Sequence, residues 1–64
     1  MKYHNYEIKK VATDLGEDDP RKNYVYEIYK DGKYIVEALT LSTAKQFIDI
    51  YDKTGDYQAA ALYL

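Results

Sequence analysis

The fold is decided by residues 23–40, which have the sequence NYVYEIYK-DG-KYIVEALT. Two runs rich in tyrosine and β-branched residues flank Asp31-Gly32, and an Asp-Gly pair in this position is a strong short-range signal for a β-hairpin. Thr40 follows, and its side-chain oxygen can accept a hydrogen bond from an early backbone N–H of a helix, with Ser42 as a second candidate cap. We therefore predict a strand, a tight turn, a second strand and the start of a helix.

Two registers of this hairpin are compatible with the sequence, and they expose different tyrosines. A two-residue turn at Asp31-Gly32 would pair Lys30 with Lys33, whereas a three-residue loop would put Gly32 in a left-handed bulge and keep the two lysines apart. The three-residue loop also produces a face that is wholly apolar or aromatic, composed of Tyr24, Tyr26, Ile28, Tyr34, Val36 and Ala38. The sequence favours this register and leaves the other open, and a slip of one residue exchanges the two faces of a strand.

The segment after Thr40 has the period of an amphipathic helix. Its apolar stripe consists of Leu41, Ala44, Phe47, Ile48 and Tyr51. We expect Phe47 and Ile48 to be buried beneath the sheet and the helix to end near Lys53 or Thr54, because Gly55 is a natural residue for the position after a helix. Residues 56–64 are ambiguous, since Asp56 and three alanines favour a short helix but the final Leu-Tyr-Leu would also suit a strand.

The N-terminal residues Tyr3 to Ala12 alternate between apolar and polar, which predicts one half-buried strand. Residues 13–22 follow as a polar loop with the acidic run Glu17-Asp18-Asp19. The prediction is therefore a single α+β domain over residues 1–64, in which a three-stranded antiparallel meander packs against one α-helix, with a short C-terminal helix or strand.

The residue inventory argues against enzymatic chemistry. The chain has no cysteine and one histidine, His4, so neither a disulfide nor a cysteine or histidine metal site is available, and we predict no metal and no cofactor. Nothing brings His4 together with the only serine, Ser42, as nucleophilic catalysis would require. Glu27 and Glu37 are interpreted as solvated strand residues. We predict that the protein is not an enzyme and has no catalytic residue.

Charge and hydropathy narrow the choice of partners. The net charge of −2 has the wrong sign for simple phosphate binding. We therefore keep as the alternative function a nucleic-acid-associated protein that stacks bases on its strand tyrosines. No apolar run approaches the roughly 20 residues needed to cross a bilayer, and the N-terminus has no apolar core of a signal peptide. We therefore expect a cytoplasmic protein that does not bind membranes.

The nine tyrosines are the main departure from an ordinary composition. In the favoured register the sheet face away from the helix is rich in apolar and aromatic residues, which predicts an interaction surface at Tyr3, Val25, Tyr29, Ile35 and Leu39. The partner would be another protein or a second copy of the chain. If residues 59–64 folded back over this face, the patch would instead be internal.

Residues Tyr26 to Asp49 combine a strand, the Asp-Gly turn, a second strand, Thr-Leu at the helix start, Ala-Lys and Phe-Ile-Asp. In this pattern the chain resembles small uncharacterised β-β-α proteins of phages and conjugative elements of low-GC Gram-positive bacteria. The resemblance covers less than half of the chain. It implies a cytoplasmic accessory protein of a mobile element and transfers no catalytic residue.

Overall fold

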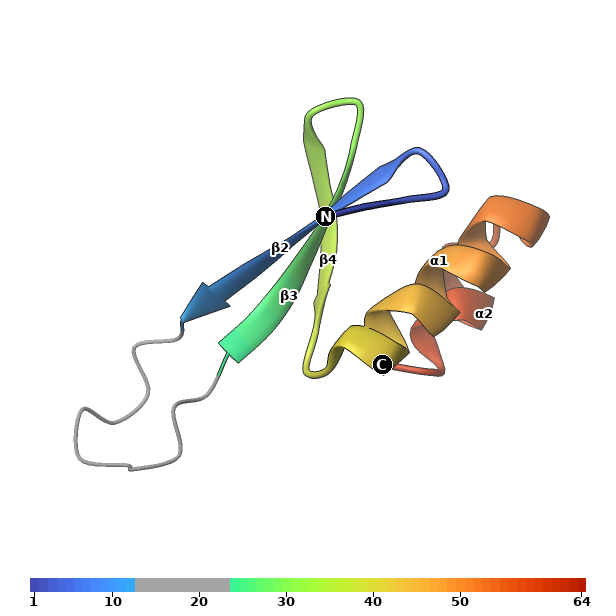
Figure 1. Ribbon diagram of the computed structural model, residues 1–64. Coiled ribbons are helices and arrows are strands. Elements are labelled where there is room, and N and C mark those ends of the chain that lie inside the picture. The colour runs from blue at the N-terminus through green and yellow to red at the C-terminus, as the bar shows by residue number, and fades with distance from the viewer. Residues whose placement is uncertain (13–23) are drawn as a thin grey trace.

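Four strands and two helices make up the described part of the chain, which is residues 1–12 and 24–64 of a computed structural model. The elements are β1 (Lys2–Tyr3), β2 (Tyr6–Ala12), β3 (Tyr24–Lys30), β4 (Lys33–Ala38), α1 (Leu41–Thr54) and α2 (Tyr57–Ala61). The strands form one antiparallel sheet in the order β1-β2-β3-β4, and α1 crosses one face of it (Figure 1). The predicted α+β class is confirmed, whereas the predicted count of three strands is wrong. The loop predicted at 13–22 lies outside the described residues.

The additional strand arises from a tight turn at His4-Asn5. Both residues have positive φ values, +50° and +66°, and asparagine tolerates this left-handed region better than most residues do. The chain reverses there, so that Tyr3 pairs with Tyr6 across the hairpin. Tyr3 and Tyr6 are three positions apart and would lie on opposite faces of one continuous strand, but the hairpin puts both on the helix side. The predicted uninterrupted strand from Tyr3 is therefore wrong.

The turn between β3 and β4 contains two residues, Asp31 and Gly32. Their φ values of +52° and +79° are both left-handed, as a type I′ turn requires, and Lys30 pairs with Lys33. The favoured three-residue loop is therefore wrong at the turn, and the two-residue alternative is the one observed. Positive φ at Gly32, which both alternatives required, is confirmed.

A β-bulge in β4 then shifts the register by one residue. Tyr29 pairs with Tyr34 but Ile28 pairs with Val36, which leaves Ile35 as the extra residue on β4. Beyond the bulge, the side chains of β4 face the same sides of the sheet as the three-residue loop predicted, with Ile28 and Val36 facing the helix. Ile35 also packs against the hydrophobic core, because a bulge interrupts the strict alternation of side chains along the strand.

Side-chain caps define both helices. The Thr40 hydroxyl accepts a hydrogen bond from the Thr43 backbone N–H at 3.1 Å, and the Thr43 hydroxyl accepts one from the Thr40 N–H at 3.3 Å, which together form a capping box. Helix α1 ends at Thr54 and is capped by Gly55, whose φ is +70°. Asp56 then accepts a hydrogen bond from the Ala59 N–H at 3.2 Å, so the helical alternative for the C-terminal segment is confirmed.

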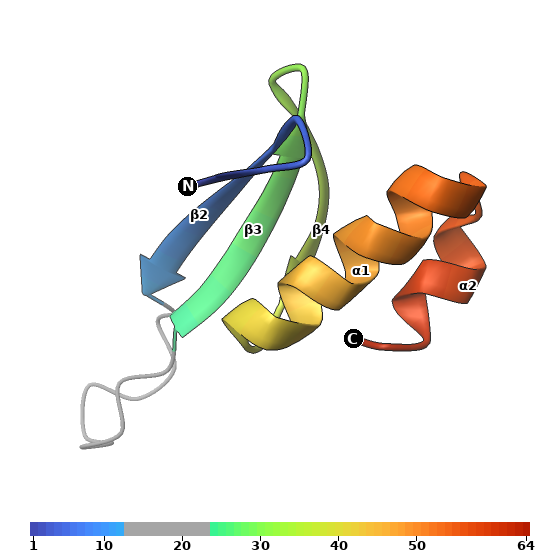
Figure 2. The ribbon, with the colours of Figure 1, turned by 45° about the vertical axis from the view of Figure 1, so that its right-hand side comes forward.

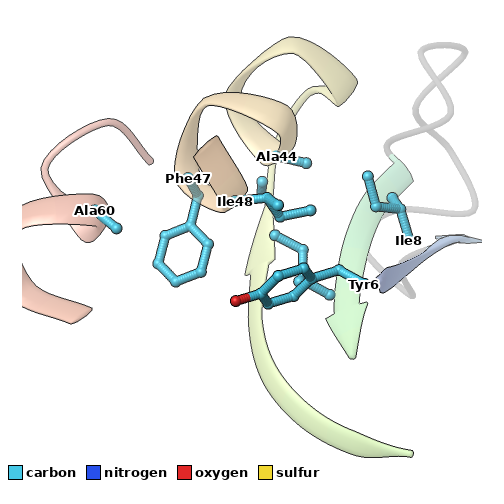
Figure 3. Packing of buried hydrophobic residues seen from close by; sticks show 8 residues of the cluster. Tyr6, Ile8, Ala44, Phe47, Ile48 and Ala60 are labelled. Atoms are coloured by element: carbon cyan, nitrogen blue, oxygen red, sulfur yellow. The ribbon is translucent and has the colours of Figure 1, made fainter. Parts of the chain in front are cut away.

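The hydrophobic core lies between the sheet and α1, and its edge extends to α2. Its buried residues are Tyr6, Ile8, Ile28, Ala38, Ala44, Phe47, Ile48 and Ala60 (Figure 3). Phe47 occupies the junction of the layers, because its ring stacks with Tyr51 and meets the edge of Tyr57 at a centroid distance of 5.7 Å. The predicted burial of Phe47 and Ile48 is confirmed.

Replacement of Phe47 by alanine tests this core. We expect Phe47→Ala to lower the free energy of unfolding by about 3–5 kcal/mol, because it removes a fully buried ring and leaves a cavity. Tyr63→Ala is the matched control, since it truncates an aromatic side chain that is half exposed. Denaturant unfolding measures both, and equal losses for the two variants would contradict the central position of Phe47.

Gly32 tests the turn. A side chain at Gly32 would meet no atom within 4 Å, so any cost of substitution comes from the left-handed backbone alone. We expect Gly32→Val to destabilise the protein by roughly 1–2 kcal/mol and Gly32→Asn to cost clearly less, because asparagine tolerates this conformation. Thermal or denaturant unfolding distinguishes the two, and identical stabilities would argue against a type I′ turn.

Candidate functional site

The sheet has one face that points away from both helices, and we call this the open face. Figure 2 shows α1 beside the sheet and α2 beyond α1, both on the other side. Cross-strand partners share a face, so the register assigns to the open face Lys2, Glu7, Lys9, Val11, Val25, Glu27, Tyr29, Tyr34 and Glu37. The alternative in which residues 59–64 cover this face is wrong, because α2 packs against α1 instead.

Tyr29 lies on the central strand β3, close to the β3–β4 turn, and three neighbours hold it in place on the open face. Its hydroxyl donates a hydrogen bond to Glu27 Oε1 at 2.8 Å, and the Lys9 Nζ lies 4.7 Å from the centre of its ring. The Tyr34 ring meets it edge to face, with centroids 5.7 Å apart. These contacts order the two tyrosines, which present rigid aromatic surface to solvent.

The same surroundings alter the acidity of both phenols. The hydrogen bond to Glu27 raises the pKa of Tyr29, and desolvation and the negative charge of Glu27 add to the effect. Desolvation raises the pKa of Tyr34, with further contributions from the charges of Glu37 and Glu27. Both hydroxyls are therefore protonated at neutral pH, where the Tyr29 hydroxyl donates its hydrogen bond to Glu27.

Two glutamates lie directly opposite each other beside this aromatic pair. Glu27 of β3 pairs with Glu37 of β4, an arrangement of like charges that is unfavourable on a sheet surface. Within residues 1–12 and 24–64 neither carboxylate forms an ion pair. Two carboxylates next to two ring faces are suited to bind a cation such as an arginine or lysine side chain.

The structure separates the five residues of the predicted interaction surface. Val25 and Tyr29 lie on the open face, and Leu39 follows β4 with 75% of its surface exposed. Tyr3 and Ile35 were placed on the wrong side of the sheet, because both pack against the core. The hairpin at His4-Asn5 puts Tyr3 beside Tyr6 on the helix side, and the bulge redirects Ile35.

Tyr3 contributes to the packing of α1 and not to the open face. Its hydroxyl donates a hydrogen bond to Asp49 Oδ1 at 2.9 Å, and this bond raises the pKa of Tyr3. His4 Nε2 lies 3.4 Å from the same carboxylate oxygen, so β1 is fixed to the helix by adjacent side chains.

Sequence reasoning missed two residues of the site, Tyr34 and Glu37, the cross-strand partner of Glu27. The two-residue turn, which the sequence left open, does place Tyr34 opposite Tyr29, so a signal for that contact existed. The approach of Glu37 to Glu27 depends on the bulge at Ile35, for which the local sequence has no distinctive residue.

Comparisons with known proteins provide no functional assignment. No protein-family model matches the chain, and searches of curated proteins and of solved structures found no similar protein. The resemblance to phage and conjugative-element proteins therefore stays a prediction. In the described ranges 1–12 and 24–64, no helix is long and apolar enough to cross a membrane, and no three metal-binding side chains gather.

The Tyr29–Glu27 hydrogen bond leads to a pH prediction. The pKa of Tyr29 is raised in the folded protein, so this contact stabilises the fold below the ordinary tyrosine pKa of about 10 and is lost as pH rises through the higher folded value. We expect Glu27→Gln to lower the pKa of Tyr29, as measured by an NMR titration of its phenol carbon. Glu7→Gln, on the same face, is the control. An unchanged titration of Tyr29 in Glu27→Gln would show that the hydrogen bond does not persist in solution.

Proposed function

We propose that the protein is a non-enzymatic interaction module whose open face binds a basic segment of another protein. The observation that carries the proposal is the pair Glu27 and Glu37, directly opposite each other beside Tyr29 and Tyr34. An arginine of the partner would bridge the two carboxylates with its forked N–H groups and pack its planar guanidinium against the tyrosine rings.

The energetics of the open face support such a contact. The repulsion between the opposed glutamates is relieved when a cation lies between them, and a cation over an exposed aromatic ring contributes about 0.5–1 kcal/mol more. Tyr29 is already fixed by Glu27, Lys9 and Tyr34, so little side-chain freedom is lost on binding. Ordered tyrosines of this kind are typical of protein-binding surfaces.

The charges favour a different protein over the other partners that the sequence suggested. A two-fold contact between two copies would place the same acidic surface on both sides, where like charges repel. Phosphates of a nucleic acid would meet Glu27 and Glu37, and Lys9, the cross-strand partner of Glu27, already contacts the Tyr29 ring. Self-association and nucleic-acid binding are therefore less favoured than a basic partner.

A peptide titration tests the proposal. We expect a short arginine-rich peptide to shift the backbone amide NMR signals of Glu27, Tyr29 and Glu37, and a peptide with glutamine in place of arginine to leave them unchanged. Glu37→Gln should weaken binding about tenfold, a loss near 1.4 kcal/mol. Glu7→Gln, a glutamate of the same face outside the pair, should have a much smaller effect.

Ultracentrifugation across a concentration series addresses the remaining alternatives. We expect a monomer at all concentrations for the parent protein and for Tyr29→Asp and Leu39→Asp. A dimer that these substitutions abolish would establish self-association in place of a basic partner. Binding of a single-stranded oligonucleotide with affinity that falls steeply with salt would likewise contradict the proposal.

A further inference from the structure

A second candidate site lies on the helix side of the sheet, at the end where both tight turns are located. It is a cleft of about 750 Å³ between the β3–β4 turn and the junction of α1 with α2. Tyrosines from four elements line it, together with two lysines of the hairpin: Tyr34, Tyr51, Tyr57, Lys30 and Lys33, with Tyr6 at the base. A cleft of this volume is in the range of ligand-binding sites, which span about 300–1,000 Å³.

Tyr6 is the residue that distinguishes this cleft from an ordinary surface depression. Its side chain belongs to the core and only 1% of its surface is exposed, yet it also lines the cleft. No residue of the described ranges accepts or donates a hydrogen bond to its hydroxyl, and no fully enclosed side-chain oxygen or nitrogen there lacks a partner, so the hydroxyl opens to the cleft. Figure 3 shows this oxygen at the far end of the ring, directed away from Ile8.

The hairpin turn contributes two lysines to the lining of the same cleft. Lys30 and Lys33 are direct cross-strand partners, and the Lys30 Nζ lies 5.2 Å from the centre of the Tyr6 ring. Neither lysine forms an ion pair with any residue in the described parts of the chain. Two cations and a phenol hydroxyl that line one cleft can donate hydrogen bonds to an anion there.

The surrounding groups restrict what kind of anion fits. Asp31 and Asp52 also line the cleft and offset the formal charge of the two lysines. A doubly charged phosphate would meet more repulsion from these carboxylates than the single negative charge of a carboxylate side chain would. On the helix side, Tyr51 and Tyr57 meet edge to face with centroids 6.3 Å apart. Such rings provide packing surface for another aromatic group.

We propose that this cleft binds a peptide segment in which a carboxylate side chain lies next to an aromatic one. The carboxylate accepts hydrogen bonds from Lys30, Lys33 and the Tyr6 hydroxyl, and the aromatic ring packs against Tyr51 and Tyr57. The site goes beyond the proposed function, because it lies on the helix side of the sheet and selects the opposite charge. Tyr34, on the edge strand β4, borders both the open face and the cleft. Neither site requires the other.

Titration with blocked Gly-Glu-Phe-Gly peptide tests the proposal, with Gly-Gln-Phe-Gly and Gly-Glu-Ala-Gly as matched probes. We expect the first peptide to bind at least about tenfold more tightly than either of the others, as measured by NMR shifts of residues around the cleft. Tyr6→Phe keeps the buried ring and removes only the hydroxyl, so we expect weaker binding with little change in melting temperature.

Lys33→Gln provides a second, surface variant that does not touch the core, and we expect it to weaken binding about tenfold. Lys9→Gln, a lysine of the open face, should leave peptide binding unchanged, and so should Glu37→Gln, which reports on the proposed function alone. Equal affinity for the glutamate and glutamine peptides, or unaltered binding by Lys33→Gln, would overturn the proposal. Equal affinity for free 3-phenylpropionate would also overturn it, because the site would then select a small acid and not a peptide.

Discussion

The burial of one helix stripe against the sheet is the interaction on which the rest of this structure depends. A chain of 64 residues without cysteine has no covalent or thiolate-metal stabilisation, so its stability comes from a small core. Phe47 and Ile48 are fully buried there, and the ring of Phe47 also contacts Tyr57 at the start of α2. The apolar side chains on the helix side of the sheet are therefore packed in the core, and the alternate residues of each strand lie on the open face.

The hairpin of β3 and β4 carries an unusual charge arrangement that this core makes possible. It places Glu27 opposite Glu37 on the open face and Lys30 opposite Lys33 on the helix side. Each pair of like charges is locally unfavourable. The core and the turn together hold the strands in a register that the charges by themselves would not select.

Both candidate sites follow from this hairpin, and they differ in how they are built. The open face is a flat surface whose tyrosines are ordered by side-chain contacts, so its recognition depends on charge and on ring faces. The cleft is a depression between layers, and its base is a core residue, Tyr6. A single small domain can thus present an acidic surface on one side and lysines at a cleft on the other.

The sequence by itself determined the elements that depend on neighbouring residues. The chain reversal at Asp31-Gly32, the Thr40 cap, the helix end before Gly55 and the buried stripe through Phe47 all arise from short-range chemistry, and each is observed. The two-residue form of the turn and the helix capped by Asp56 were each one of the alternatives that the sequence left open. Only the tertiary structure decided where the chain reverses at His4-Asn5 and where β4 bulges at Ile35. A period of two shows that side chains alternate along a strand, but it does not fix how the strands pair. The side of the sheet that each residue faces depends on which side chains the core buries. Tyr3 and Ile35 therefore pack against the core.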